Sequence, residues 1–360
     1  MLIPSPLEAI NYPLFAEKQI HVYVKRDDLI HAEISGNKWR KLKYNLIAAK
    51  AQKINTILTF GGAYSNHISA TAAVGKKFYF KTIGIIRGEE TLPLNPTLLQ
   101  AEKDGMRFLY VSRTDYRKKH TSEFIDKLKE KLGNFYIIPE GGGNKLGVKG
   151  CNDIVHEIDI DFNHILTDCG TGATLAGICE ALKVNQKAIG IPVLKGGEFI
   201  NDEVKMWLGD ACARTESRYS LETGYHFGGY AKYKPKLIEF MRDFYTQTNI
   251  KTDPIYTGKL FYALVDLAKK DYFKRGSTIV VVHTGGLQGI KGFEDEIQNH
   301  GYSKDDLEIW DVPGSLEFPL QAQLLAKTAK YDAIVCIGLI VDGGIYRHEF
   351  VAQTVVDGIV

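Results

Sequence analysis

Short apolar runs alternate with helical segments along most of this chain. Residues 20–26 alternate apolar and polar side chains, as a half-buried strand does, and residues 54–60 form a short buried-type strand. Further strands are predicted at 80–87, 106–111, 135–139, 164–168, 189–194 and 277–282. Helices are predicted at 39–52, 68–74, 95–104, 115–132, 145–158, 201–211, 235–248 and 260–270, and 219–233 is predicted to be a loop.

Strands that alternate with helices predict an α/β fold, with a parallel sheet covered on both faces. The pattern restarts near residue 145. A chain of 360 residues is also too long for one ordinary core, so we expect two or more domains.

Composition narrows the class of protein. The net charge of +2 gives no electrostatic reason to expect binding to nucleic acid or to an acidic membrane. The first six residues lack the pattern of a signal peptide, and the longest apolar run, 333–341, is too short to span a bilayer. Five cysteines without a CxxC pair indicate a reducing compartment, with no disulfide frame and no zinc site. We therefore expect a cytoplasmic protein.

Four predicted strands end in glycine turns, at 61–62, 141–143, 170–172 and 285–286. In open α/β sheets, ligands bind beyond the carboxyl ends of the strands, where glycine turns and helix starts can hold an anion. The turn at 169–177 is the strongest candidate because Thr171 and Thr174 add hydroxyl donors; the alternative is a simple strand–helix turn. It is not a dinucleotide fingerprint, since Leu175 stands where a third glycine is needed.

One lysine stands out among the candidate nucleophiles. Lys38 lies between a glycine and a predicted helix start, and Arg40, Lys41 and Lys43 follow it. Neighbouring cations lower the pKa of an amine, and a neutral amine can attack a carbonyl. The alternative is a solvated basic helix end.

Other candidates are open to two interpretations. The triplet Ser65-Asn66-His67 could touch a cofactor or cap the next helix. Tyr256 follows Pro254 in a turn and could pack on the surface or meet a ligand. Cys169 is assigned no role, and the histidines lack the spacing of a metal site, so no metal is expected.

Six motifs in order resemble one enzyme family over residues 1 to about 293. They are VKRDDL (24–29), SGNKWRKL (35–42), GGAYSNH (61–67), GTGATLAG (170–177), DPIYTGK (253–259) and HTGG (283–286). They resemble the pyridoxal 5'-phosphate family of 1-aminocyclopropane-1-carboxylate deaminases and D-cysteine desulfhydrases. The resemblance implies fold type II, similar to the tryptophan synthase β chain. It also implies a large cofactor domain (1–38 and 149–293) and a small domain (39–148).

The resemblance also implies a role for each matching residue. Lys38 is expected to carry the Schiff base, with Ser65 beside the substrate and Tyr230 as a further active-site residue. Tyr256 and Asn66 are expected to lie against the two faces of the cofactor ring, and Thr284 to hydrogen-bond its nitrogen. The phosphate is expected to be held by Gly170, Thr171, Gly172, Ala173 and Thr174.

The last segment, 294–360, resembles the middle of a different enzyme, 6,7-dimethyl-8-ribityllumazine synthase. The resemblance rests on DVPGSLEFPL (311–320) and VDGGIYRH (341–348), and the segment is expected to form a partial α/β layer of helix, strand, helix, strand and helix. Because two site-bearing segments of that family have no counterpart here, we expect this segment to have no lumazine synthase activity.

The function expected from these features is a lyase that eliminates the β-substituent of D-cysteine or a related D-amino acid, giving a keto acid, ammonia and sulfide. The alternatives are ring opening of 1-aminocyclopropane-1-carboxylate, a lumazine synthase-type transferase, and a non-catalytic assembly module. The deaminase branch is expected to carry glutamate and leucine where Thr257 and Thr284 stand here. A neutral hydroxyl supports a protonated ring nitrogen less than a carboxylate does, which favours elimination of a good leaving group. The expected partner is a small amino acid, and we expect a homodimer whose assembly the last segment could alter.

Overall fold

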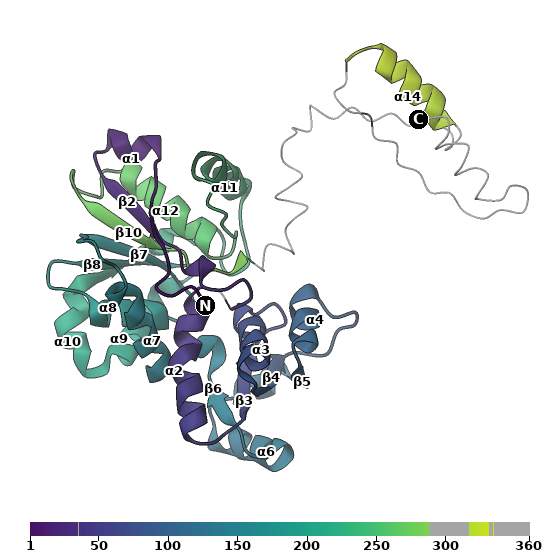
Figure 1. Ribbon diagram of the computed structural model, residues 1–360, viewed down its shortest axis with the longest axis vertical. Coiled ribbons are helices and arrows are strands. Elements are labelled where there is room, and N and C mark those ends of the chain that lie inside the picture. Colours follow the sequence, from purple (N-terminus) through teal and green to yellow (C-terminus); the bar gives the residue numbers. More distant parts are fainter. Residues whose placement is uncertain (35, 288–316, 331–333, 335–360) are drawn as a thin grey trace, which may run out of the picture. The chain divides into compact units, whose positions relative to one another are not determined.

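The computed structural model describes residues 1–34, 36–287, 317–330 and 334. It divides into two units, Met1–Gln298 and Asn299–Val360. The described strands all belong to the first unit, where they form one sheet of six strands and one of four (Figure 1).

The six-stranded sheet is parallel except at one edge. Its order is β1-β2-β10-β7-β8-β9, and only β1 runs antiparallel to its neighbour. The strands are β1 (Leu7–Ala9), β2 (His21–Lys25), β7 (His164–Cys169), β8 (Lys187–Pro192), β9 (Tyr219–Leu221) and β10 (Thr278–Val282).

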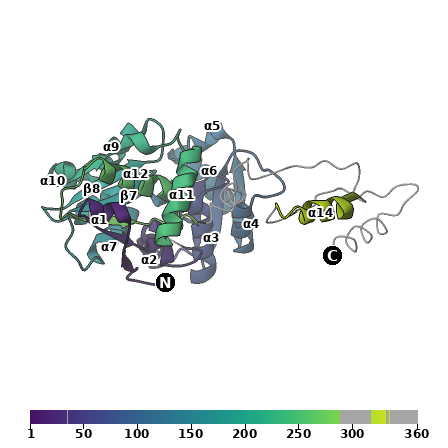
Figure 2. The ribbon, with the colours of Figure 1, turned by 90° about the horizontal axis from the view of Figure 1, so that it is seen from above.

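Both faces of this sheet are buried, as the apolar strands predict. Along β10, Ile279 and Val281 join one core, while Val280 and Val282 join the other. The first core packs under α1 (Pro13–Glu17), α11 (Pro235–Thr248) and α12 (Thr257–Lys269), which lie together in both views (Figures 1 and 2). The second packs under α7 (Lys145–His156), α8 (Ala173–Ala181) and α9 (Ile200–Leu208). A parallel sheet covered on both faces is the arrangement expected for this class.

The four-stranded sheet is parallel throughout, in the order β5-β4-β3-β6. Its strands are β3 (Thr56–Gly61), β4 (Lys81–Arg87), β5 (Met106–Val111) and β6 (Tyr136–Ile138). One face carries α2 (Asn37–Ala51), α3 (Asn66–Phe78) and α4 (Pro96–Lys103), and the other carries α5 (Arg113–Tyr116) and α6 (Ser122–Leu132). Helix α2 contacts both α3 and α7, so it joins the layers of the two sheets (Figure 1).

Several predicted elements differ in detail. The helix predicted over 115–132 is two helices, because Thr121 caps α6 by accepting a hydrogen bond from Phe124 N at 3.3 Å. The predicted loop 219–233 begins with the edge strand β9, and the helix predicted over 201–211 ends at Leu208. The other described elements of the unit are the four-residue α10 (Cys212–Thr215) and short 3-10 turns at Asp27–Leu29, Glu140–Gly142, Gly197–Phe199, Gly209–Ala211, Glu216–Arg218 and Thr223–Tyr225.

In the second unit the structure describes one helix, α14 (Phe318–Lys327). The rest of the helix and strand pattern predicted for 294–360 lies outside the described residues, apart from the few that flank α14. Among the described residues, no helix has both the length and the apolar character needed to cross a membrane.

Candidate active site

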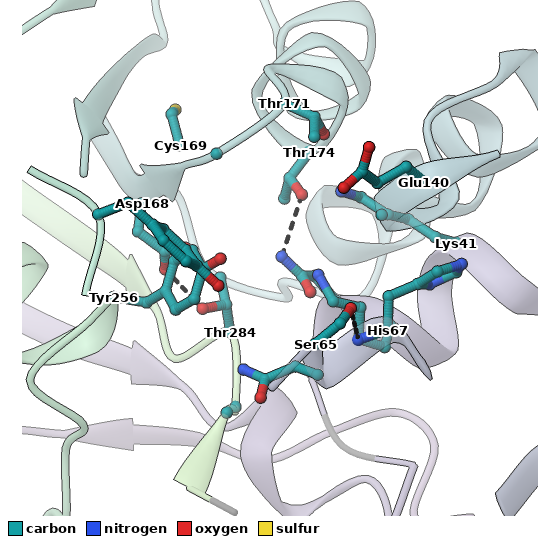
Figure 3. A pocket seen from close by; sticks show the side chains of 18 of the residues that line it. Lys41, Ser65, His67, Glu140, Asp168, Cys169, Thr171, Thr174, Tyr256 and Thr284 are labelled. Carbon is teal, nitrogen blue, oxygen red and sulfur yellow. Dashed lines mark hydrogen bonds between the residues drawn. The ribbon is translucent and has the colours of Figure 1, made fainter. Parts of the chain in front are cut away.

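The glycine turns that end β3, β6, β7 and β10 surround one cavity of about 610 Å³ (Figure 3). The first turn of α2 and the loops around residues 230 and 256 complete its wall. The structure thus brings together nearly all the residues singled out in the sequence: Lys38, Ser65, Asn66, Gly170, Thr171, Gly172, Thr174, Tyr230, Tyr256 and Thr284. Ala173 is buried at the start of α8 and does not line the cavity.

The turn before Lys38 is held against the end of β10. Gly36 has φ 64°, and a Cβ on this residue would lie 1.7 Å from the carbonyl oxygen of Thr284. Asn37 N donates to that same carbonyl at 3.2 Å, and Asn37 Nδ2 donates to Thr174 Oγ1 at 3.2 Å. The lysine is therefore fixed relative to both Thr284 and the turn at 170–174.

Burial, more than neighbouring charge, activates Lys38. Burial, followed by the charge of the nearby Lys41, lowers the pKa of Lys38 to about 7 against the opposing charge of Asp168. The prediction that Arg40 and Lys43 contribute is wrong, because both are paired with acids. Arg40 forms ion pairs with Asp27 and Glu157, and Lys43 pairs with Asp153 at 2.7 Å.

Lys41 is a cavity residue for which no separate role was predicted from the sequence. Its side chain is buried, burial lowers its pKa, and it forms no ion pair with any described residue. Thr171 Oγ1 is likewise buried without a hydrogen-bond partner among the described residues. Both groups lie beside the positive end of α8. An unpaired ammonium, an unpaired hydroxyl and a helix start suit an anion such as a phosphate.

The two interpretations of Ser65 are both compatible with the structure. Ser65 Oγ caps α3 by accepting from His67 N at 3.2 Å and Ile68 N at 3.3 Å, and the residue also lines the cavity. This cap starts α3 at Asn66, earlier than predicted.

The geometry defines the protonation of His67. Thr59 Oγ1 donates its one hydrogen to Ile138 O at 2.7 Å, so His67 Nε2 must donate to Thr59 Oγ1, 2.8 Å away. His67 Nδ1 is then an acceptor, with no partner among the described residues. Burial, followed by Lys38 and Lys41, holds the pKa of His67 well below its ordinary value, so the ring is neutral.

Tyr256 and Tyr230 form one wall of the cavity. Asp253 accepts hydrogen bonds from Tyr256 N at 2.8 Å and Thr257 N at 3.0 Å, which fixes the turn and the start of α12. The two tyrosine rings meet edge to face, with centroids 6.0 Å apart. Lys259 holds the loop of Tyr230 by donating to Gly229 O at 2.8 Å.

Asp168 is the acidic residue that the sequence reasoning missed. Thr284 Oγ1 donates to Asp168 Oδ1 at 2.5 Å, and both residues line the cavity while only 4% and 5% exposed. Burial, with a smaller contribution from the charge of Asp253, raises the pKa of Asp168 to about 6 even though the bond from Thr284 and the charge of Lys38 act to lower it. Thr257 is different: its hydroxyl is buried against Asp253 and does not reach the cavity. One feature of the sequence could have revealed Asp168: it is an acidic residue at the end of an apolar strand, two positions before a glycine turn.

Known proteins match most of the first unit. The profile of the family described as pyridoxal-phosphate dependent enzyme matches residues 2–285. A Pyrococcus furiosus protein, named as a candidate 1-aminocyclopropane-1-carboxylate deaminase, is 35% identical over 290 residues, covering 77% of this chain and 88% of that protein. The Arabidopsis thaliana protein named bifunctional D-cysteine desulfhydrase/1-aminocyclopropane-1-carboxylate deaminase is 31% identical. The match covers 82% of this chain and 79% of that protein. A solved structure described as an ACC deaminase homologue is 30% identical and superposes with a TM-score of 0.70. The match covers 83% of this chain and 95% of that one.

The end of the chain matches a second family. The profile of 6,7-dimethyl-8-ribityllumazine synthase matches residues 287–360. The Rhodococcus erythropolis protein of that name is 57% identical over 68 residues, which are 19% of this chain and 44% of that protein. This segment therefore spans less than half the length of its relative.

Proposed function

Because this chain belongs to the family of pyridoxal-phosphate dependent enzymes, in the group of the 1-aminocyclopropane-1-carboxylate deaminases and D-cysteine desulfhydrases, we propose that it releases ammonia from D-cysteine or a related D-amino acid. The observation that carries this proposal is the Lys38 amine, which faces the cavity with its pKa lowered to about 7. A lysine of this kind can accept a proton from the α-carbon of an amino acid near neutral pH.

The cavity fits the cofactor that defines this family. Lys41 and the unpartnered hydroxyl of Thr171 offer a positive charge and a donor to the phosphate, beside the start of α8. Tyr256 offers an aromatic surface to the ring, and Thr284 a hydroxyl to its nitrogen. When bound, pyridoxal phosphate supplies an aldehyde that captures the substrate amine and a ring that accepts electrons.

The protein groups then have distinct tasks. Lys38 holds the cofactor through its amine and, once released, takes the α-proton. Ser65, which caps α3, lies beside the substrate, and Asn66, the first residue of α3, lies against the face of the cofactor ring opposite Tyr256. Tyr230 narrows the entrance beside Tyr256, because 47% of its surface is exposed while its ring packs on Tyr256.

A second candidate reaction is ring opening of 1-aminocyclopropane-1-carboxylate. It is favoured by the buried carboxylate of Asp168 behind Thr284, since a carboxylate near the ring nitrogen strengthens the electron-accepting ring. The names of the related proteins include both reactions.

The test compares keto-acid release from D-cysteine, L-cysteine and the cyclopropane amino acid by the same preparation. We expect D-cysteine to be turned over fastest and Lys38→Ala to abolish turnover. Faster release from the cyclopropane substrate would replace the proposal with the second candidate.

The attachment of the cofactor is tested separately. Borohydride reduction followed by peptide mapping should mark Lys38. Lys43→Ala is the matched control, because Lys43 lies on the same helix but is paired with Asp153 and does not line the cavity. A modified lysine at any other position contradicts the assignment.

A further inference from the structure

We propose that Asp168 is a positioning residue that acts through Thr284 to hold a proton on the ring nitrogen of bound pyridoxal phosphate. The proposal rests on the proposed function, because it takes Thr284 to face that nitrogen. It concerns a residue outside the matched motifs, since GTGATLAG begins at Gly170.

The single hydrogen of the Thr284 hydroxyl determines what this group presents to the ring nitrogen. A hydroxyl has one hydrogen to donate and two lone pairs with which to accept. The hydrogen is committed to Asp168 Oδ1, 2.5 Å away (Figure 3). Only lone pairs then remain on the cavity side of the oxygen. A ring nitrogen that carries a proton can donate to them, whereas an unprotonated nitrogen would place a lone pair against a lone pair.

Burial strengthens the preference of Thr284 for a protonated ring nitrogen. Asp168 and Thr284 are almost fully shielded from solvent, so water cannot readily take the place of either partner. A proton on the ring nitrogen also brings a positive charge close to the Asp168 carboxylate, in surroundings where such an attraction is weakly screened. The titratable groups around Asp168 belong to several elements and are Lys38, Lys41, Cys169, Asp253 and Tyr256.

The consequence bears on the choice of substrate. The sequence suggested that the ring nitrogen meets only a neutral hydroxyl and that the electron-accepting ring is therefore weak. With Asp168 behind the hydroxyl, the same threonine supports the protonated ring, which is the stronger electron acceptor. Thr284 in this chain can thus support the more demanding ring-opening reaction as well as elimination.

The test uses the full chain loaded with pyridoxal 5'-phosphate that carries ¹⁵N at the ring nitrogen. In the unmodified protein we expect the ¹⁵N chemical shift of a protonated pyridine. Asp168→Asn keeps an acceptor for Thr284 but removes the charge, and should move the shift toward that of an unprotonated ring. Thr284→Val should do the same, and Thr284→Ser should restore the protonated shift.

Glu140→Gln is the matched control, because Glu140 is a second carboxylate of the cavity wall that makes no described contact with Thr284. Its shift should equal that of the unmodified protein. An unprotonated ring in the unmodified protein, or a protonated ring in both Asp168→Asn and Thr284→Val, overturns this inference alone. Failure of the cofactor to bind at Lys38 overturns the proposed function and this inference with it.

Discussion

Four cations lie within six residues of the chain, but only two of them face the cavity. Arg40 and Lys43 are paired with acids outside it, whereas Lys38 and Lys41 line it without such pairs among the described residues. The two unpaired cations are therefore left for the ligand. Burial lowers the pKa of both amines, and the charge of Lys41 lowers that of Lys38 as well, which favours Lys38 as the nucleophile.

The pH dependence of Lys38 follows from its lowered pKa. As pH rises, the amine should lose its proton with a midpoint of about 7, instead of the ordinary value of about 10.4. In the cofactor-free protein, the rate of acetylation at Lys38 should rise with pH up to this midpoint and then level off. Competitive labelling with acetic anhydride from about pH 5 to about pH 10, followed by mass spectrometry, measures it.

Lys43 provides the comparison within the same sample. Burial lowers the pKa of Lys43, but its bond to Asp153 outweighs this and raises it. Its labelling should still be rising where that of Lys38 has levelled off. Parallel curves for the two lysines would contradict the assigned shift.

Individual residues differed in how well the sequence revealed them. Lys38 and the turn at 170–174 lie within short contiguous motifs, so they could be recognised from the sequence alone. Asp168 gained its meaning only when β7 and β10 became neighbours in the sheet and brought Thr284 to it, across 116 positions of sequence. No spacing rule covers such a pair.

At the scale of elements, the start of α2 depends on a glycine that permits close contact. Gly36 has φ 64° and ψ −149°, a region that only glycine adopts readily, and its Cα hydrogens face the Thr284 carbonyl. Both the backbone angles and the lack of space therefore exclude a side chain.

Gly36→Ala should separate the helix start from β10. We expect a loss of about 3 kcal/mol or more in the free energy of unfolding, because the added Cβ meets backbone that cannot rotate away. Cofactor binding should be lost as well. Denaturant titration and the absorption spectrum measure the two effects.

Gly133→Ala isolates the backbone part of this cost. Gly133 has φ 79° and ψ −152°, close to Gly36, but no atom lies within 4 Å of the position of a Cβ. It should cost about 1–3 kcal/mol and leave cofactor binding intact. Equal losses for the two variants would show that the contact with Thr284 does not matter.

Most helices and strands were predictable because their apolar periods match the burial that the fold imposes. The failures have local physical causes. One is a threonine cap that divides 115–132 into α5 and α6. Another is Asp253, which captures the amides of residues 255–257 and so starts α12 at Thr257, earlier than residue 260. Strands of three residues, such as β1 and β9, leave too little pattern to recognise.

At the scale of the whole molecule, the chain joins matches to two enzyme families. Every residue of the described cavity lies at or before Gly286, and the lumazine synthase profile begins at 287. We propose that the two sheets are the cores of the large and small domains expected from the sequence. The homodimer and the cytoplasmic location stay predictions.

A chain shortened to end at Gln298 should keep its cofactor. We expect its dissociation constant for pyridoxal phosphate to stay within a factor of about two, less than about 0.5 kcal/mol. The reason is that the cavity is built entirely within the first unit. Titration of the visible absorption band measures this, with Lys38→Ala in the shortened chain as the control. Loss of the band from a shortened chain that is still folded would assign the last segment a part in the site.

Thr284 takes part in the candidate active site through both its backbone carbonyl and its side-chain hydroxyl. Its carbonyl accepts from Asn37 N, next to Lys38, and its hydroxyl faces the cavity beside Asp168. One hydrogen bond and the close contact of Gly36 therefore hold the backbone next to the anchoring lysine against the residue that carries the hydroxyl opposite the ring nitrogen. The turn that carries Ser65 follows β3 of the four-stranded sheet, whereas Thr284 follows β10 of the six-stranded sheet. Ser65, proposed to lie beside the substrate, is thus carried by a different sheet from Thr284, proposed to lie opposite the ring nitrogen.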